Sequence, residues 1–251
     1  MRHVKRYREL FESQIGLTKE QIEWLDNCTS KSWTRSSWTL NPQTGLVDVS
    51  GDFDCSGQRL TDFKGVRFGV VTGDFYCSGN KLTSLKGAPQ EVRGYFNCSY
   101  NDLTSLKDAP QKAGESFWCF NNKLTSLEGA PKKVGGDFNC GNNELTSLKD
   151  APQEVGDGFN CSNNKLTSLE GAPKKVRLKF NCSGNPVSES VLKTLYKKMQ
   201  SGMSWPDAVA SQWRYIRSGE DKVMLASYNP NLSPEKLKGY QALARLKRRS
   251  I

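Results

Sequence analysis

Residues 115–131 read ESFWCFNNKLTSLEGAP, and residues 136–152 read GDFNCGNNELTSLKDAP. Both stretches share the frame F-x-C-x-x-N-x-L-T-S-L, and only the residues between its fixed points differ. Cysteines carry this frame along the chain: the first step between them is 22 residues, and every later step is 21 residues. The seven cysteines of the frame are Cys55, Cys77, Cys98, Cys119, Cys140, Cys161 and Cys182.

Other residues repeat in the same register. A Phe lies two positions before each of these cysteines, and an Asn lies three positions after all but the first, where Gln58 stands. A unit this short cannot bury its apolar residues alone, so the repeats are expected to stack into a solenoid. The alternation within F-x-C is typical of a strand that buries Phe and Cys and exposes the residue between them. We predict parallel strands, one per repeat, with a ladder of hydrogen-bonded Asn side chains and an extended rather than helical outer side.

The cysteines invite a metal or disulfide interpretation, which the spacing does not favour. Metal ligands cluster at short spacings such as C-x-x-C, and the chain has no such pair. Disulfide frameworks are typical of small secreted domains. Cysteines stacked in register would point in parallel directions, a poor geometry for an S–S bond. We therefore expect a column of reduced thiols that pack as small apolar side chains, with no metal and no cofactor.

The two ends of a solenoid need covers for their exposed core and strand edges. The N-terminal segment has helical spacing at Val4, Tyr7, Leu10 and Phe11, and TKEQ at Thr18 is a capping box that opens a second helix. Helical patterns return from Ser188 onward. We predict three parts: a helical N-terminal cap and entry segment over residues 1–45, the repeats over 46–187, and a basic helical C-terminal cap or module over 188–251.

The frame resembles the leucine-rich repeat, L-x-x-L-x-L-x-x-N-x-L. In GDGFNCSNNKL, residues 156–166, the matching residues are Phe159, Cys161, Asn164 and Leu166, whereas Val155 stands one position too early to supply the first Leu. The stretch LTSLEGAPKKVGGDFNC, residues 124–140, is similar to repeat proteins of large bacteriophages. The resemblance implies a mostly β, leucine-rich-repeat-like parallel solenoid with α-helical caps. It also implies a binding scaffold with no catalytic residues to carry over.

Charge is concentrated at the C-terminal end. The formal net charge is +10, and residues 186–251 carry 12 basic and 5 acidic side chains, 12 − 5 = +7. No apolar run approaches the roughly 18 residues needed to cross a bilayer, and the basic N-terminus has no apolar core typical of a secretory signal. We therefore expect a cytoplasmic protein, located in the host cytoplasm if the chain comes from a phage, with no membrane partner.

Catalysis finds little support in the sequence. His3 is the only histidine, so a Ser/His or Cys/His arrangement is nearly excluded, and no phosphate-binding loop is present. We expect no enzyme. The informative positions are the outward ones beside the fixed Phe and Cys, where most residues are small and polar. The exceptions fall in three consecutive repeats: Tyr76, Tyr95, Tyr100, Trp118 and Phe120.

Exposed aromatic clusters are typical of protein-binding hot spots. We predict that these five residues bind a host or phage protein on the concave face of the repeats. Drift of an unselected surface and cover by a flanking helix remain as alternatives. A rival function is nucleic-acid or virion association through a basic patch. Its residues are Lys236, Lys238, Arg245, Lys247, Arg248 and Arg249.

Overall fold

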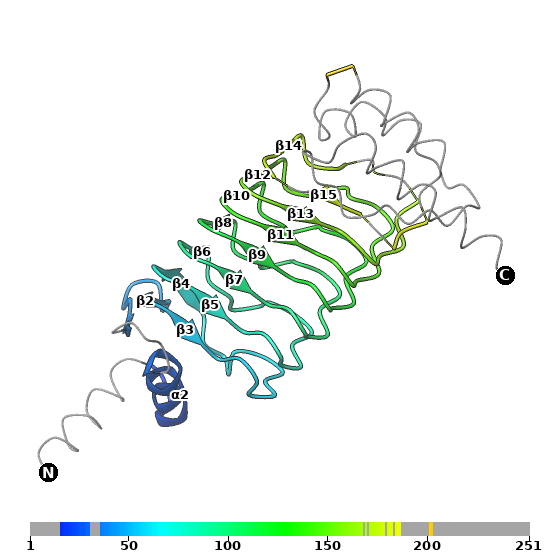
Figure 1. Ribbon diagram of the computed structural model, residues 1–251. Helices are drawn as coiled ribbons and strands as arrows, with labels where there is room; N and C mark the ends of the chain where they lie inside the picture. Colours follow the sequence, from blue (N-terminus) through cyan, green and yellow to red (C-terminus); the bar gives the residue numbers. More distant parts are fainter. Residues whose placement is uncertain are drawn as a thin grey trace, which may run out of the picture.

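A computed structural model describes residues 16–30, 36–167, 169, 171–178, 180–182, 184–186 and 201–202 of the chain. The repeats wind into an elongated parallel β-solenoid whose rungs stack one on another (Figure 1). Strands of successive rungs pair at a spacing of 21 residues, for example Phe117 with Phe138. The stacked architecture, its period and its mostly β character are as the repeat predicts.

Each rung carries two short strands, so the expectation of one strand per repeat is wrong. The F-x-C segments form one sheet, here called the Phe-Cys sheet, and the segments before them form a second, here called the Val sheet. The Phe-Cys sheet consists of β3 (Phe53–Asp54), β5 (Phe75–Tyr76), β7 (Phe96–Asn97), β9 (Phe117–Trp118), β11 (Phe138–Asn139), β13 (Phe159–Asn160) and β15 (Phe180–Asn181). The Val sheet consists of β1 (Ser37–Leu40), β2 (Val47–Ser50), β4 (Phe68–Val71), β6 (Glu91–Val92), β8 (Lys112–Ala113), β10 (Lys133–Val134), β12 (Glu154–Val155) and β14 (Lys175–Val176).

The second strand explains the residue that did not fit the leucine-rich frame. Val155 lies in β12 and is buried, so it belongs to the Val sheet instead of opening the F-x-C strand. The extended outer side that the Pro-containing segment predicts is therefore partly a hydrogen-bonded sheet of its own. The second strand in each rung is therefore a difference between this solenoid and the leucine-rich-repeat pattern from which it was predicted.

The core is a set of columns that run along the stack. The fixed Phe rings lie over one another with centroids 5.0 to 5.8 Å apart between successive rungs. The seven repeat cysteines are buried and free, as the sequence predicts. Leu side chains from the L-T-S-L segments are buried beside them. Stacking thus supplies the apolar partners that a single unit lacks.

The predicted Asn ladder is confirmed. The Asn143 side-chain amide donates hydrogen bonds to the carbonyls of Cys119 at 3.1 Å and Cys140 at 3.0 Å, and its oxygen accepts one from the backbone N–H of Leu124 at 3.0 Å. Each Asn therefore satisfies buried backbone groups of its own rung and of the rung before it. The same bonds recur at Asn80, Asn101, Asn122, Asn164 and Asn185.

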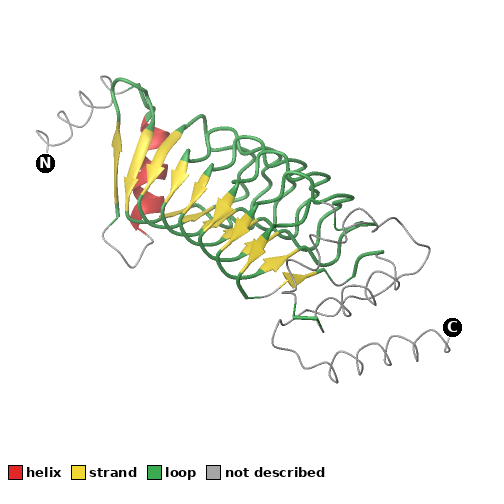
Figure 2. Cartoon of the chain, turned by 90° about the horizontal axis from the view of Figure 1, so that it is seen from above, coloured by secondary structure: helices red, strands yellow, loops and turns green. Residues whose placement is uncertain are grey.

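Helix α2, Lys19–Ser30, packs against the N-terminal end of the stack (Figure 2). Its capping box is reciprocal: the Gln21 N–H donates to Thr18 Oγ1 at 3.2 Å, and the Thr18 N–H donates to Gln21 Oε1 at 2.8 Å. Trp24 packs edge-on against Phe53, with ring centroids 5.4 Å apart. The helix thereby covers the first Phe of the column, for which no preceding rung exists.

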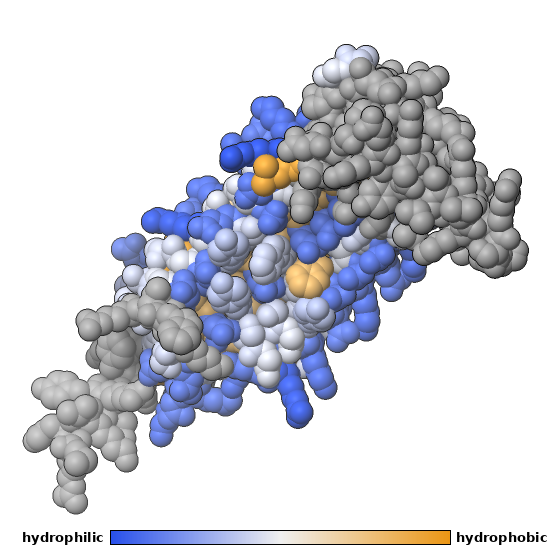
Figure 3. Space-filling view, in the orientation of Figure 1, coloured by the Kyte–Doolittle hydropathy of each residue, from blue (hydrophilic) through white to orange (hydrophobic). Residues whose placement is uncertain are grey.

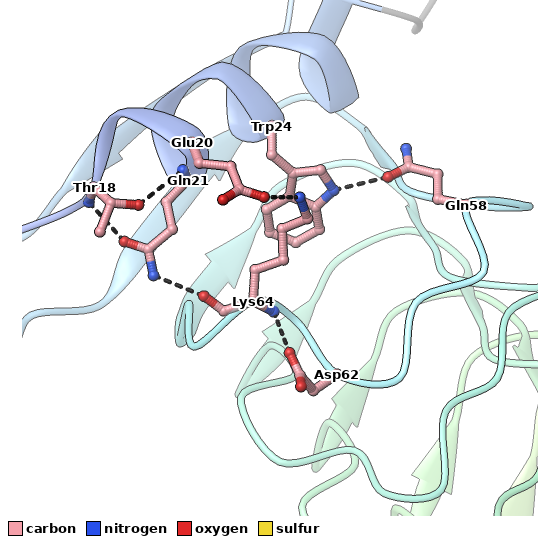
Figure 4. Close-up of polar contacts among 7 residues, drawn as sticks. All are labelled: Thr18, Glu20, Gln21, Trp24, Gln58, Asp62 and Lys64. Atoms are coloured by element: carbon pink, nitrogen blue, oxygen red, sulfur yellow. Dashed lines mark hydrogen bonds and ion pairs between the residues drawn. The ribbon is translucent and has the colours of Figure 1, made fainter.

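Gln58 takes the place of the ladder Asn because it faces this helix (Figure 4). Its Oε1 accepts a hydrogen bond from Trp24 Nε1 at 2.8 Å. Nearby, Gln21 Nε2 donates to the Lys64 carbonyl at 2.7 Å, and Lys64 Nζ pairs with Glu20 at 2.9 Å. The longer Gln side chain thus reaches helix α2. In later rungs the shorter Asn bonds instead to backbone carbonyls of the stack.

A hairpin covers the N-terminal edge of the Val sheet. β1 pairs antiparallel with β2, and every later pairing in that sheet is parallel. The first predicted helix, at residues 4–11, and the predicted helices from residue 188 onward lie outside the described residues. Within the part of the chain that the structure describes, no helix combines the length and apolar character needed to cross a membrane.

Candidate functional site

The outward residues of the Phe-Cys sheet form columns along the stack. Tyr76 pairs with Asn97, and Asn97 pairs with Trp118, so the two aromatic residues lie two rungs apart in one column. All five predicted aromatic residues are at least partly exposed, and Tyr100 reaches 58% exposure. In Figure 3, pale and orange side chains gather over the middle of this face, with hydrophilic side chains along its margins.

Four of the five aromatic rings meet in two pairs. The Tyr95 and Trp118 rings lie 5.9 Å apart in a tilted arrangement, and the Tyr100 and Phe120 rings lie 5.2 Å apart, edge to face. Tyr76 instead donates its hydroxyl to Asp74 Oδ2 at 2.8 Å. Stacking therefore brings aromatic side chains from three consecutive rungs onto one face of the sheet. The set is called the aromatic cluster here and consists of Tyr76, Tyr95, Tyr100, Trp118 and Phe120.

At the position before each Cys, the usual residue stabilises the turn that follows the strand. Asn97 accepts a hydrogen bond from the Ser99 N–H, and Asn139 accepts one from the Gly141 N–H, each at 3.0 Å. Trp118 has no acceptor atom, and a Tyr hydroxyl stands too far along its ring to reach its own backbone. Trp118 and Tyr76 therefore give up a bond that their neighbours in the column make.

The column three residues before Cys behaves in the same way. Asp52 and Asp74 each accept a hydrogen bond from the N–H of the next rung at 2.8 Å, and Ser116 does so at 2.9 Å. Tyr95 occupies this column with a side chain that has no acceptor within that reach. A third aromatic residue thus replaces a side chain that normally ties one rung to the next.

Tyr100 departs from its column in backbone conformation. The residue two positions after each Cys has a positive φ, for which Gly and Asn are the favoured residues. Every other member of the column is one of these: Gly57, Gly79, Asn121, Asn142, Asn163 and Gly184. Tyr100 adopts φ of 55°. A bulky residue held there costs on the order of 1 kcal/mol, a strain that tends to persist at functional sites.

Phe120 also changes the polar pattern beneath the cluster. In its column Ser78 donates a hydroxyl hydrogen bond to Ser56 at 3.2 Å. Ser99, whose column neighbour in the next rung is Phe120, is fully buried, and its hydroxyl has no hydrogen-bond partner among the described residues. An unpaired buried hydroxyl is unfavourable, so this position too departs from the arrangement that best stabilises the stack.

The electrostatic environment of the face is negative. Burial raises the pKa of Tyr76, and the hydrogen bond to Asp74 and the charge of Asp52 raise it further. The pKa of Tyr95 is raised chiefly by a hydrogen bond to Glu115, with the charges of Glu115 and Asp74 adding to it. Both phenols therefore stay neutral, with carboxylates beside them.

Five thiols of the cysteine column are held in their protonated form. Burial raises the pKa of Cys77, Cys98, Cys119, Cys140 and Cys161 well above the usual range. Since the thiolate is the nucleophile and the metal ligand, these buried side chains act as packing residues. The expectation that the repeat cysteines are buried free thiols is confirmed.

The Val sheet has a different character. Glu154 pairs with both Lys133 and Lys175 at 3.2 Å, and these residues line a shallow groove of about 440 Å³ together with Lys174 and Arg177. The pairs are exposed and contribute little to stability. The six basic residues predicted as a nucleic-acid patch, from Lys236 to Arg249, lie outside the described residues, and that patch stays a prediction.

The sequence pattern identified the aromatic residues. It did not reveal that they replace side chains that accept hydrogen bonds from the backbone. The signal was available for Tyr100, because a column whose other members are all Gly or Asn indicates a positive φ. Searches against protein-family models, curated proteins and solved structures find no match to this chain.

Proposed function

We propose that the chain is a non-enzymatic scaffold that binds a partner protein through the aromatic cluster on its Phe-Cys sheet. The observation that carries the proposal is the cluster itself: five aromatic side chains in three consecutive rungs stand where the frame elsewhere has small or polar residues. Aromatic residues dominate the energetics of protein interfaces because they bury much apolar area with little loss of side-chain freedom.

Drift accounts poorly for these departures. Neutral drift would change positions at which any side chain serves equally well. Here Tyr95 and Trp118 occupy positions whose usual side chains bond to backbone N–H groups, and Tyr100 occupies a position of positive φ. Cover by helix α2 is also disfavoured, because that helix packs against Phe53 at the N-terminal end of the stack and Tyr100 is 58% exposed. A binding role gives a reason for retaining residues that do not favour the fold.

The resemblance to bacteriophage leucine-rich-repeat proteins suggests the setting in which such a scaffold would work. A phage protein of this kind would bind, and in that way inhibit, a protein of the infected host, using the face of its repeats that the leucine-rich-repeat resemblance predicts to be concave. This step rests on analogy and on no single residue.

The proposal is tested by affinity capture from a bacterial host lysate with three immobilised proteins. The wild type and a Lys112→Ala/Lys133→Ala control on the Val sheet are expected to retain the same partner. The Trp118→Ala/Phe120→Ala variant is expected to lose it, since truncation of a central aromatic anchor typically weakens binding by about 2 kcal/mol or more. Retention of the partner by the aromatic variant, with its folding confirmed by circular dichroism, would place the interface elsewhere.

A further inference from the structure

We infer that the partner presents a positively charged segment, rich in Arg or Lys, to the aromatic cluster. This inference rests on the proposed function and adds to it the chemistry of the bound surface. Its basis is the distribution of charge on the Phe-Cys sheet, which is opposite in sign to the chain as a whole.

Over its first six rungs the face contains carboxylates and no Lys or Arg, and in the seventh Lys179 stands three positions before Cys182. In each of the first six rungs, the eight residues from four before Cys to three after it form the outward columns and their turns. These six segments contain no Lys or Arg and six acidic residues, although the whole chain has a formal net charge of +10. The acidic residues are Asp52, Asp54, Asp74, Glu115, Asp137 and Asp157, and all are at least partly exposed.

Two basic residues beside the cluster, Lys123 and Arg93, form ion pairs on neighbouring surfaces. Lys123 pairs with Asp102 at 2.6 Å, on the side that follows the Asn ladder. Arg93 pairs with Glu91 at 3.4 Å, toward the Val sheet. The carboxylates next to the cluster therefore keep their negative potential, which would repel the phosphates of a nucleic acid and attract a basic protein segment.

The aromatic rings suit a cation as well. The faces of Trp and Tyr rings attract Arg guanidinium and Lys ammonium groups, and Trp is the strongest of the aromatic side chains in this respect. Tyr76 donates its hydroxyl to Asp74, and Glu115 lies close enough to Tyr95 to raise its pKa, so each ring has a carboxylate beside it. A guanidinium that packs on Trp118 or Tyr95 would thus find both a ring face and an acceptor, the combination that Arg prefers.

The inference is tested with fluorescently labelled peptides and anisotropy titrations of the full chain. One peptide has three Arg residues separated by Gly-Ser, and two matched peptides have Glu or Leu in place of Arg. The Arg peptide is expected to bind tightest, with an affinity that falls as salt rises from about 50 to 300 mM, because exposed charges are screened. Trp118→Ala is expected to weaken it roughly three- to tenfold.

Charge variants separate this inference from the proposed function. Asp74→Asn/Glu115→Gln is expected to weaken the Arg peptide and flatten its salt dependence, whereas Glu91→Gln/Glu154→Gln on the Val sheet should leave both unchanged. Preference for the Leu peptide, abolished by Trp118→Ala, would leave the binding face intact and overturn the charge inference alone. The charge inference would also be overturned if the Arg peptide bound the wild type no more tightly than the Glu peptide does. The same holds if the Arg peptide bound the Trp118→Ala variant as tightly as the wild type. If the wild type self-associates and Trp118→Ala abolishes this, the positively charged segment belongs to a second copy of the chain. That result would overturn the inference of a separate basic partner.

Discussion

Two adjacent residues, Phe117 and Trp118, show how the fold and the proposed binding site divide at the residue scale. Phe117 is fully buried in the ring column, between Phe96 and Phe138. Trp118 follows it in the same strand and points to the opposite side, because successive side chains of a strand alternate. One residue thus holds the stack together, and its neighbour is available to a partner.

The first prediction compares the two truncations. Phe117→Ala should lower the free energy of unfolding by about 3–5 kcal/mol, since it leaves a cavity in a column packed on both sides. Trp118→Ala should lower it by about 1 kcal/mol or less, since it removes mainly the exposed contact with Tyr95. Urea unfolding followed by circular dichroism measures both. The opposite order would mean that the assignment of inward and outward positions is shifted by one residue.

At this scale the sequence predicted much of the structure. The strict spacing of Phe, Cys and Asn was enough to assign the core columns and the Asn ladder, since only a stack satisfies all of them together. The aromatic residues could be assigned to the outward side by alternation alone. The contacts between Tyr95 and Trp118 could not be predicted, because ring geometry depends on how side chains of two rungs settle against each other.

At the scale of the element, the second strand of each rung is what the sequence did not reveal. Strands such as β10 have two residues, of which only Val134 is buried. One inward residue gives no alternating pattern, so periodicity cannot detect such a strand. Pairing with the equivalent segments of the rungs above and below makes it a strand, and that pairing follows from the stack and not from local preference.

The cysteine column leads to a second prediction, for the dependence of stability on pH. Thiols in an unfolded chain titrate at about pH 8.5. Burial raises the pKa of Cys77, Cys98, Cys119, Cys140 and Cys161 in the folded chain. Above that pH the unfolded state loses protons that the folded state keeps. The free energy of unfolding should therefore fall as pH rises from 7.5 to about 9.5.

Urea titrations at the two pH values measure this change, and a midpoint that stays constant or rises would contradict it. A thiol reagent provides the control. Because the thiols are buried and protonated, labelling of the repeat cysteines should be slow in the folded protein and fast in denaturant. Fast labelling of the folded protein would mean that the column is open to solvent.

At the scale of the whole molecule, the stack depends on an unbroken register. Each rung contacts the rungs beside it, so stability is approximately a sum of rung and interface contributions. The strands and the Asn ladder repeat every 21 residues through the central rungs. Removal of one complete 21-residue repeat should therefore keep the remaining rungs in register, whereas removal of part of a repeat should not.

The third prediction follows from this. Deletion of residues 136–156 removes one unit and joins Gly135 to Asp157, which restores the local sequence that precedes Asp157 in the wild type. This variant should keep a β-type circular dichroism spectrum and unfold cooperatively. Deletion of residues 137–156, one residue fewer, should strongly destabilise the protein, because it misaligns the Phe, Cys and Asn columns on one side of the junction. Equal stability of the two variants would argue against a register-dependent stack.

The central claim is that the aromatic cluster serves binding and not folding, and one measurement tests it most directly. Tyr100→Asn/Trp118→Asn/Phe120→Ser replaces three cluster residues with residues that the frame carries in other rungs. Asn at residue 100 adopts the positive φ with less strain than Tyr, and Asn at residue 118 restores a hydrogen-bond acceptor for the backbone. Ser at residue 120 gives the Ser99 hydroxyl a hydrogen-bond partner. These gains should offset the lost ring contacts, so the free energy of unfolding in urea should stay within about 1 kcal/mol of the wild type. A loss of more than about 3 kcal/mol would show that the cluster is part of the packing that holds the solenoid together, and would contradict the account.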